Sequence, residues 1–212
     1  MSFNSQYSKK KHFSVWPWSD LISLCSRYYK FKTTSSVLEI GCGVGANIPF
    51  FLSKNVYYHG IDISEEAIKT IKKNFKSKYV NCIVGNYLDN HYQNKKFDLI
   101  VDRGAITCGN NKNDINKILE LASNNLKKGG LFIGIDWYSK KSFFYKNQKV
   151  KKSFVDPKNG PFSKIGGVYF CNYKDMKLFF YNFKVIHLHE RNVKNFIDDN
   201  LSISSWCVVA KK

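Results

Sequence analysis

The feature that most constrains the fold of this chain is a regular alternation of short apolar runs with amphipathic segments. Apolar runs that end in glycine or polar residues predict buried strands, and apolar residues spaced three and four apart predict helices. The expected strands are 37–40, 56–63, 79–89, 97–106 and 131–139, separated by helices at 46–54, 64–75 and 113–130. Strand and helix alternate this regularly only in an α/β fold with a parallel sheet.

The remaining segments flank this alternating core. Residues 1–35 are expected to form an N-terminal segment with one helix, capped by Ser19 or Asp20. Residues 139–172 are basic, aromatic and interrupted by glycine and proline, which is typical of an insertion over a site. A helix at 172–183 and strands at 184–193 and 204–212 follow, and the helix at 113–130 is expected to close on Gly129 and Gly130. Without an internal repeat or linker, residues 1–212 are expected to form a single domain.

Composition excludes several classes of protein. A hydrophobic content of 43% with 16% aromatic residues is too high for a disordered chain. The six cysteines include no Cys-x-x-Cys pair and no histidine at metal-ligand spacing, so we expect reduced thiols and no metal site. Residues 1–20 lack the apolar run of a signal peptide, and nowhere are about 18 apolar residues consecutive, so we expect a cytoplasmic protein without a membrane span.

The charge of the chain is strongly positive. Lysine and arginine number 34 against 16 acidic residues, a net charge of +18 that attracts phosphates, nucleic acid or anionic lipid. The excess is nearly all lysine, scattered with asparagine through every segment, which favours a chain-wide bias over a binding stripe. A nucleic-acid partner is therefore possible but not favoured.

Polar residues gather where the expected strands end. These residues are Glu39, Asp62, Asn86, Asp102 and Asp136. Ligands of parallel sheets bind beyond the carboxyl ends of the strands, so five such residues in succession predict a site at that edge.

The turn after the first strand is rich in glycine. The stretch "VLEIGCGVGAN", residues 37–47, reads as G-x-G-x-G and also as G-x-G-x-x-A. Such a turn lets the backbone approach a ligand closely and leaves N–H groups free to bind it. Asp62, at the end of the next strand, is placed to accept hydrogen bonds from ribose hydroxyls, as nicotinamide and adenosyl cofactors both require.

The motifs "VLEIGCGVGAN", "GIDIS", "GNYLD", "FDLIVDRGAI" and "LKKGGLFI" follow one another in an order and spacing that resembles the class I S-adenosylmethionine-dependent methyltransferases. The resemblance is strong over residues 36–136 and weaker to the end of the chain. It implies a Rossmann-like, doubly wound, mostly parallel sheet of seven strands with an antiparallel C-terminal strand.

The resemblance also implies roles for individual residues around S-adenosylmethionine. The methionine and ribose portions would lie against Glu39, Gly41, Gly43 and Gly45, in a cradle also lined by Cys42 and Asn47. Asp62 would bind the ribose hydroxyls, Ile63 would lie against the adenine, and Asn86 and Tyr87 would contact its edge and face. The family more often has aspartate at position 86, and an asparagine oxygen can still accept a hydrogen bond.

The acceptor side is less specific. "DRGAI" lacks the Asn/Asp-Pro-Pro-aromatic motif of enzymes that methylate base amino groups and resembles small-molecule enzymes instead. Trp16 and Trp18 flank Pro17 as in an aromatic-proline element that closes over the cofactor; alternatively, both tryptophans pack the first helix onto the sheet. Residues 1–35 would then form a lid and residues 139–172 would cover the substrate.

Candidates for a general base are Asp102, then Asp136, with His12 and His91 behind them. Arg103 holds an anionic acceptor group or pairs with Asp102 or Glu39.

The leading interpretation is methyl transfer from S-adenosylmethionine to an oxygen or nitrogen of a small, anionic metabolite or a sugar- or nucleotide-linked precursor. Methylation of RNA or protein and binding of S-adenosylmethionine without catalysis are the alternatives. A nicotinamide dehydrogenase is disfavoured because no Tyr-x-x-x-Lys signature follows the glycine turn. The sequence leaves the acceptor and the oligomeric state open.

Overall fold

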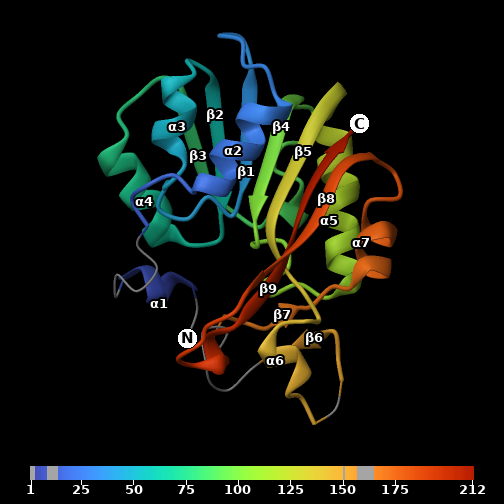
Figure 1. The fold of residues 1–212 in the computed structure, drawn as a ribbon. Helices are drawn as coiled ribbons and strands as arrows, with labels where there is room; N and C mark the ends of the chain where they lie inside the picture. The colour runs from blue at the N-terminus through green and yellow to red at the C-terminus, as the bar shows by residue number, and fades with distance from the viewer. Residues whose placement is uncertain (1–2, 9–13, 150, 157–164) are drawn as a thin grey trace.

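A seven-stranded sheet forms the centre of the computed structural model, which describes residues 3–8, 14–149, 151–156 and 165–212 (Figure 1). In spatial order the strands are β3 (Val80–Val84), β2 (Tyr57–Asp62), β1 (Ser36–Ile40), β4 (Phe97–Arg103), β5 (Leu126–Tyr138), β9 (Ile203–Lys211) and β8 (Lys184–Val193). The first five pair in parallel, and β9 is antiparallel to both of its neighbours. The predicted mostly parallel sheet with an antiparallel C-terminal strand is confirmed.

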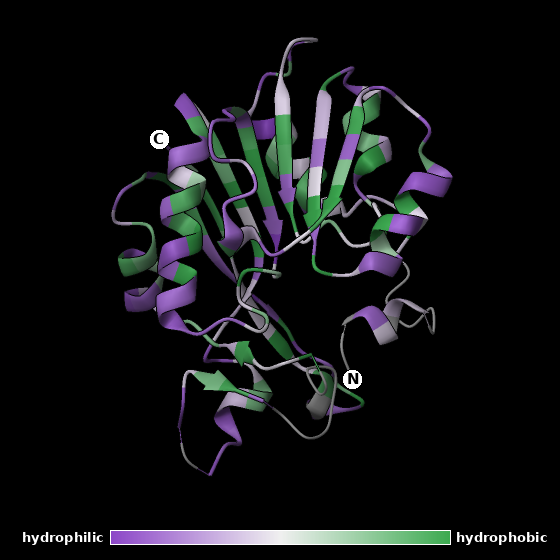
Figure 2. Ribbon diagram, turned by 180° about the vertical axis from the view of Figure 1, so that it is seen from behind, coloured by the Kyte–Doolittle hydropathy of each residue, from purple (hydrophilic) through white to green (hydrophobic). Residues whose placement is uncertain are grey.

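Helices cover both faces of the sheet. One layer holds α2 (Ser19–Tyr28), α3 (Ile48–Ser53) and α4 (Glu65–Asn74), and the other holds α5 (Lys112–Asn125) and α7 (Tyr173–Phe179) (Figure 1). Each layer buries its apolar stripe against the sheet in a separate hydrophobic cluster, and Figure 2 shows hydrophobic segments in the strands together with hydrophilic ones. Burial on both faces is what a parallel sheet requires.

Side-chain caps begin three of these helices. The Ser64 hydroxyl accepts a hydrogen bond from the Ala67 amide, and capping boxes formed by Asn111 with Asp114 and by Asn172 with Asp175 begin α5 and α7. Each cap satisfies backbone donors that the first turn of a helix leaves free.

Two predicted helix ends are wrong. The N-cap of α2 is Trp18, without a side-chain hydrogen bond, because the Asp20 carboxylate pairs with Arg191 instead. Helix α5 ends at Asn125, and Gly129 and Gly130 lie inside β5, where its register with β4 shifts. The extended backbone from Leu126 onward pairs with the sheet, and that tertiary pairing overrides the local signal of the glycines.

The smaller elements lie beyond the carboxyl ends of the parallel strands (Figure 1). They are α1 (Phe3–Ser8), η1 (Tyr87–Asp89), α6 (Phe143–Lys146), the paired strands β6 (Phe154–Val155) and β7 (Val168–Tyr169), and η2 (Asp199–Leu201). The Gly109 amide donates to the Gly167 carbonyl at 2.8 Å, and the Tyr169 amide donates to the Thr107 carbonyl at 2.8 Å. These bonds hold the inserted segment against the loop after β4.

Within the part of the chain that the structure describes, no helix combines the length and apolar content that crossing a bilayer demands.

Candidate functional site

A cavity of about 870 Å³ opens at the carboxyl ends of the parallel strands. The loops after β1, β2, β3 and β4 line most of its wall. The N-terminal part of the chain adds Tyr7, Ser14 and Trp18, and the later segments add Tyr138, Ile165, Gly166 and Ile203. The predicted edge of the sheet is therefore where the cavity lies, and its size suits a small-molecule ligand.

The glycine turn after β1 lines this cavity through Gly41 and Gly43, whereas the predicted Gly45 is not among the lining residues. Gly41, Gly43 and Gly45 all have positive φ, at 70°, 53° and 85°. A Cβ atom on Gly41 would lie 2.1 Å from the Ala105 Cβ, and one on Gly43 would lie 2.7 Å from the Tyr7 hydroxyl. Glycine at these positions thus gives the backbone its left-handed conformation and keeps space for close neighbours.

Glu39 is buried beneath the turn. Its two carboxylate oxygens accept hydrogen bonds from the Asn47 amide nitrogen at 2.7 Å and from the Tyr58 hydroxyl at 2.6 Å. Burial raises the pKa of Glu39 to about 7, although both hydrogen bonds lower it. Asn47 also accepts from the Trp18 amide at 3.1 Å, so Glu39 connects the turn to the start of α2.

Asp62 stands at the end of β2, as predicted, and faces the cavity. Its oxygens accept hydrogen bonds from the amides of Gly43 at 2.8 Å and Ser64 at 2.9 Å. Burial raises its pKa, and these two bonds oppose that rise. The next residue, Ile63, lines the cavity with a side chain that is 57% exposed. The Asp62 carboxylate thus offers a fixed hydrogen-bond acceptor, and the neighbouring Ile63 offers an exposed apolar surface. Such a pair could accept hydrogen bonds from hydroxyl groups and pack against a planar ring.

Three further predicted residues line the cavity in different ways. Asn86 is exposed and uses its side-chain oxygen to accept from the Leu88 amide at 3.0 Å. Tyr87 is buried, and its hydroxyl donates to Asn125 at 2.8 Å in the core. The Cys42 thiol lies against β2, where a Cβ on Gly60 would be 2.7 Å from its sulfur.

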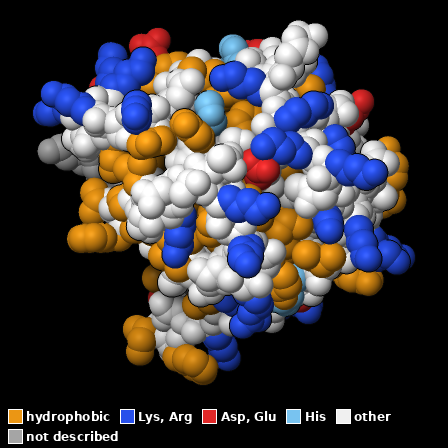
Figure 3. Space-filling model, turned by 90° about the horizontal axis from the view of Figure 1, so that it is seen from above, with side chains coloured by type: hydrophobic (Ala, Val, Ile, Leu, Met, Phe, Trp, Pro, Cys, Tyr) orange, Lys and Arg blue, Asp and Glu red, His pale blue; other side chains and the backbone are white. Residues whose placement is uncertain are grey.

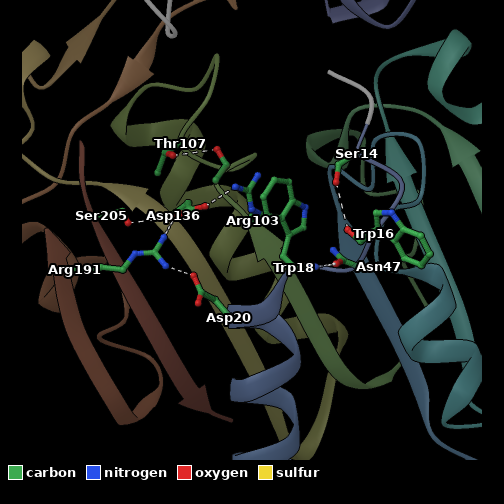
Figure 4. A network of polar contacts seen from close by, with 11 residues as sticks. Ser14, Trp16, Trp18, Asp20, Asn47, Arg103, Thr107, Asp136, Arg191 and Ser205 are labelled. Atoms are coloured by element: carbon green, nitrogen blue, oxygen red, sulfur yellow. Dashed lines mark hydrogen bonds and ion pairs between the residues drawn. The ribbon is translucent and has the colours of Figure 1, made fainter. Parts of the chain in front are cut away.

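The two tryptophans before α2 separate in the structure (Figure 4). Trp18 lines the cavity, and the guanidinium carbon of Arg103 lies 3.4 Å from its ring centroid, which is a cation–π stack. Trp16 is 76% exposed and is not part of the cavity wall, and its ring points in a different direction from that of Trp18. The structure therefore does not bring Trp16 to the site, and Trp16 does not pack α2 onto the sheet either.

Arg103 pairs with Asp136 rather than with Asp102 or Glu39. Its Nη2 lies 2.8 Å from one Asp136 oxygen, and the Nη2 of Arg191 lies 2.9 Å from the other. Arg191 in turn pairs with Asp20 of α2 (Figure 4). Asp136 itself has a positive φ of 56°, which is uncommon outside glycine and directs its side chain between the two guanidinium groups.

Asp102 is fully buried and does not reach the cavity wall. Its oxygens accept from the Trp137 indole nitrogen at 2.7 Å and the Ile106 amide at 3.1 Å. Burial raises its pKa to about 7, against the lowering effect of these bonds. This placement suits a residue that holds the loop after β4. His91 lies near Asp89 outside the cavity wall, and His12 falls outside the described residues.

Sequence reasoning missed several residues of the cavity. Tyr7 reaches it because Asn4 of α1 accepts hydrogen bonds from the Ser64 hydroxyl at 2.9 Å and the Glu66 amide at 3.1 Å. The polar start of the chain carries no periodic signal that would have found Tyr7. Tyr138, at the end of β5, follows the same strand-end rule that selected Asp136 and could have been found by it.

Comparisons with known proteins agree with this geometry. A family model described as "Methyltransferase domain" matches residues 31–191. Malonyl-[acyl-carrier protein] O-methyltransferase 2 of Ilyobacter polytropus is 31% identical over 125 residues, which are 58% of this chain and 46% of that protein. The chain thus spans about half the length of this curated relative.

Solved structures share the fold. An S-adenosylmethionine-dependent methyltransferase of Methanosarcina mazei superposes with a TM-score of 0.71 at 17% identity, covering 89% of this chain and 96% of that one. Phosphoethanolamine N-methyltransferase 2 of Haemonchus contortus, in complex with S-adenosyl-L-methionine, gives 0.69 at 14% identity, covering 100% of this chain and 60% of that one.

Proposed function

The chain belongs to the methyltransferase-domain family, and from that premise we propose that it transfers a methyl group from S-adenosylmethionine to a small, anionic acceptor. The observation that carries the proposal is the pairing of the glycine turn with Asp62. The Gly43 amide donates to the Asp62 carboxylate at 2.8 Å and so orients it. The carboxylate, which can accept hydrogen bonds from ribose hydroxyls, therefore lies beside a glycine backbone that a ligand can approach closely. This arrangement is the one that an adenosyl cofactor needs.

The residues of the cavity fit that cofactor. Gly41 and Gly43 have no side chain, and a Cβ at either position would collide with a neighbouring residue of the cavity wall. The exposed side chain of Ile63 offers an apolar surface for the adenine ring. Asp62 would hold the ribose hydroxyls, and Asn86 retains its amide nitrogen as a donor toward the adenine. When bound, S-adenosylmethionine supplies a methyl group activated by its sulfonium.

The anionic character of the acceptor rests on Arg103. Among the described residues that line the cavity, Arg103 is the only lysine or arginine. The basic insertion contributes only Ile165 and Gly166 to the described part of the wall, and its Lys140 and Lys141 pair with Asp175 and Glu190. Arg103 would bind a carboxylate or phosphate through its planar guanidinium.

The name of the curated relative supports this choice. A malonyl group carries a free carboxylate, and the protein of Ilyobacter polytropus is named for methylating malonyl attached to acyl-carrier protein. We propose a carboxylate-bearing acceptor as the first class to screen. Sugar- and nucleotide-linked phosphates form the second class.

Catalysis on this proposal consists mainly of alignment and exclusion of water. Arg103 fixes the acceptor, Asp62 fixes the cofactor, and the segments that carry Tyr7, Trp18 and Ile165 cover the reacting atoms. Alignment matters because methyl transfer is an in-line displacement, and water exclusion matters because charge is neutralised when an anion meets a sulfonium. We assign Asp136 to positioning Arg103 and Asp102 to holding the loop after β4.

The test is calorimetric titration of the protein with S-adenosylmethionine and with S-adenosylhomocysteine. Replacing Asp62 by alanine is expected to weaken binding by about tenfold or more, because a charge-assisted hydrogen bond contributes about 1.5–3 kcal/mol. Glu120→Ala, an acid removed from the exposed side of α5, is the matched control and should bind as the wild type does.

Failure of folded wild-type protein to bind either ligand overturns the proposed function. Equal affinity of the Asp62→Ala and wild-type proteins removes Asp62 from the cofactor site. Cofactor binding without turnover across both acceptor classes would instead support the non-catalytic alternative.

A further inference from the structure

The hairpin between β8 and β9 presents uncovered apolar side chains. Ile197 is 98% exposed and Phe196 is 85% exposed, more than any other large apolar side chain among the described residues. Val193 and Leu201, which flank them, are each about half exposed. Isolated exposed apolar residues are ordinary, but four within nine positions at the end of one hairpin form a surface that favours a partner.

The chain holds these side chains outward by a defined turn. The Asn195 side-chain oxygen accepts hydrogen bonds from the Ile197 and Asp198 amides, both at 2.8 Å. The Asn195 amide donates to the Ser202 hydroxyl at 3.0 Å, and η2 completes the turn. The exposure of Phe196 and Ile197 is thus a consequence of a hydrogen-bonded conformation.

Helix α6, which is followed by several lysines, lies beside this tip. Helix α6 packs against η2, where the Phe143 amide donates to the Ser202 carbonyl at 3.4 Å, and α6 leads directly into exposed lysines at 146, 149, 151 and 152. Residues 140–155 contain six lysines and no acidic residue. The hairpin adds Lys194, whose ammonium lies 5.1 Å from the Phe196 ring centroid, against Asp198 and Asp199. The hairpin end therefore carries one lysine and two aspartates of its own, and the positive charge of this neighbourhood comes from the lysines that begin at the end of α6.

The tip also adjoins the cavity. Ile203, two residues after Leu201, lines the cavity and packs with Ile165 of the insertion. The hairpin end, α6 and the small sheet lie together beyond the carboxyl ends of the strands (Figure 1). A surface that received the tip would therefore lie on the side of the molecule where the cavity opens.

From these observations we infer that residues 193–201 insert into the surface of an anionic lipid bilayer. Phe196 and Ile197 enter the boundary between headgroups and acyl chains, and Lys146, Lys149 and Lys152 lie against lipid phosphates. Buried apolar area together with attraction to anionic lipid is what holds peripheral proteins on membranes. A protruding tip suits this medium better than a stable protein interface, which needs about 800 Å² from each partner.

Vesicle co-sedimentation of the full chain tests the inference. Vesicles of phosphatidylcholine alone are compared with vesicles that also contain phosphatidylglycerol, at low and high salt. Wild-type protein is expected to bind the anionic vesicles, and high salt should release it. The double variant Phe196→Ser/Ile197→Ser should bind the anionic vesicles at least about tenfold more weakly. The reason is that serine side chains bury much less apolar area among the acyl chains than phenylalanine and isoleucine do.

Tyr181→Ser is the matched control, since Tyr181 is 76% exposed, follows α7 and is not part of the hairpin, so this change should leave vesicle binding unchanged. The double variant should keep wild-type affinity for S-adenosylhomocysteine, because neither residue lines the cavity. That measurement separates this inference from the proposed function and verifies that the variant is folded.

Three results overturn the inference: no binding of wild type to anionic vesicles, equal binding of the double variant, or equal binding to neutral vesicles. Self-association that the double variant abolishes, without vesicle binding, would assign the tip to a second copy of the chain instead.

Discussion

At the residue scale, two buried carboxyl groups near the cavity, Glu39 and Asp102, are partly protonated at neutral pH. Burial raises the pKa of Glu39 and of Asp102 to about 7. In the unfolded chain the same groups titrate near pH 4. The folded state therefore binds more protons than the unfolded state between about pH 4 and pH 7. The extra proton binding by Glu39 and Asp102 therefore adds to the free energy of unfolding. This contribution is complete below about pH 4 and is lost as the pH rises through about 7.

The variant Asp102→Asn tests this protonation. In wild type, each of the two carboxyls should lower the free energy of unfolding by up to about 1.4 kcal/mol per pH unit across that window. The variant should lose one of these two contributions, so its stability falls less steeply with pH. Urea unfolding at several pH values from about 5 to 7 measures the difference between the slopes. Parallel slopes would contradict a raised pKa for Asp102.

Two of the predicted site residues, Asp136 and Asp102, use their carboxyl groups to bind neighbouring residues of the protein. Asp136 is held between Arg103 and Arg191, and Asp102 accepts from Trp137 and Ile106. Carboxylates engaged in this way orient their neighbours more readily than they remove protons from a substrate. The strand-end rule thus finds residues that hold neighbouring side chains as well as residues, such as Asp62, that line the cavity.

At the element scale, α2 is tied to the strand ends by one continuous set of contacts (Figure 4). Asp20 pairs with Arg191 of β8, and Trp18 stacks on Arg103 at the end of β4. The Trp18 amide donates to Asn47 at 3.1 Å in the glycine turn. The start of α2 therefore connects the cofactor half of the cavity to the half that holds the proposed acceptor.

The turns after β1 and β4 allow a matched test of why glycine is needed. Gly41 and Gly109 have nearly the same φ, 70° and 74°, but a Cβ on Gly109 would meet nothing within 4 Å. Gly109→Ala should lower the free energy of unfolding by about 1 kcal/mol through backbone strain alone. Gly41→Ala should cost more, because its Cβ also meets Ala105 at 2.1 Å, and should weaken S-adenosylhomocysteine binding.

Urea unfolding of the two alanine variants measures the difference in stability, and calorimetry measures the difference in binding. If Gly41→Ala is no less stable than Gly109→Ala, the close contact with Ala105 is not a constraint on the turn.

At the scale of the whole molecule, the net charge of +18 comes from lysines in every part of the chain, with one local group of six at residues 140–155. Figure 3 shows lysine and arginine side chains dispersed among hydrophobic and neutral ones over the face seen from above. The cavity holds one such cation among its described lining residues, Arg103. This distribution supports a small-molecule acceptor over RNA, although the charge alone attracts any polyanion.

Measuring the binding of several unrelated RNA oligonucleotides at increasing salt concentrations tests whether RNA is a specific ligand of the protein. Binding measured by fluorescence anisotropy is expected to be weak, to fall steeply with salt and to be equal for all sequences, as for non-specific contact with phosphates. Tight binding to one RNA at physiological salt would favour the alternative of RNA methylation.

Local patterns determined much of the fold. The apolar runs that became β1, β2 and β4, the glycine turn and the strand-end position of Asp62 were all predicted, because each depends on residues adjacent in the sequence. The seven-stranded sheet with an antiparallel last strand was expected from the resemblance of these motifs to a known family, whereas the spatial order of the strands was given only by the structure.

Packing between distant segments decided the rest. Asp102 became buried, Arg103 paired with Asp136, and Tyr7 came to lie against Gly43. Each outcome depends on partners far away in the sequence, whose approach is set by how helices and strands pack. Periodicity describes which face of an element is apolar, whereas the environment of a single polar side chain arises only when those faces are brought together.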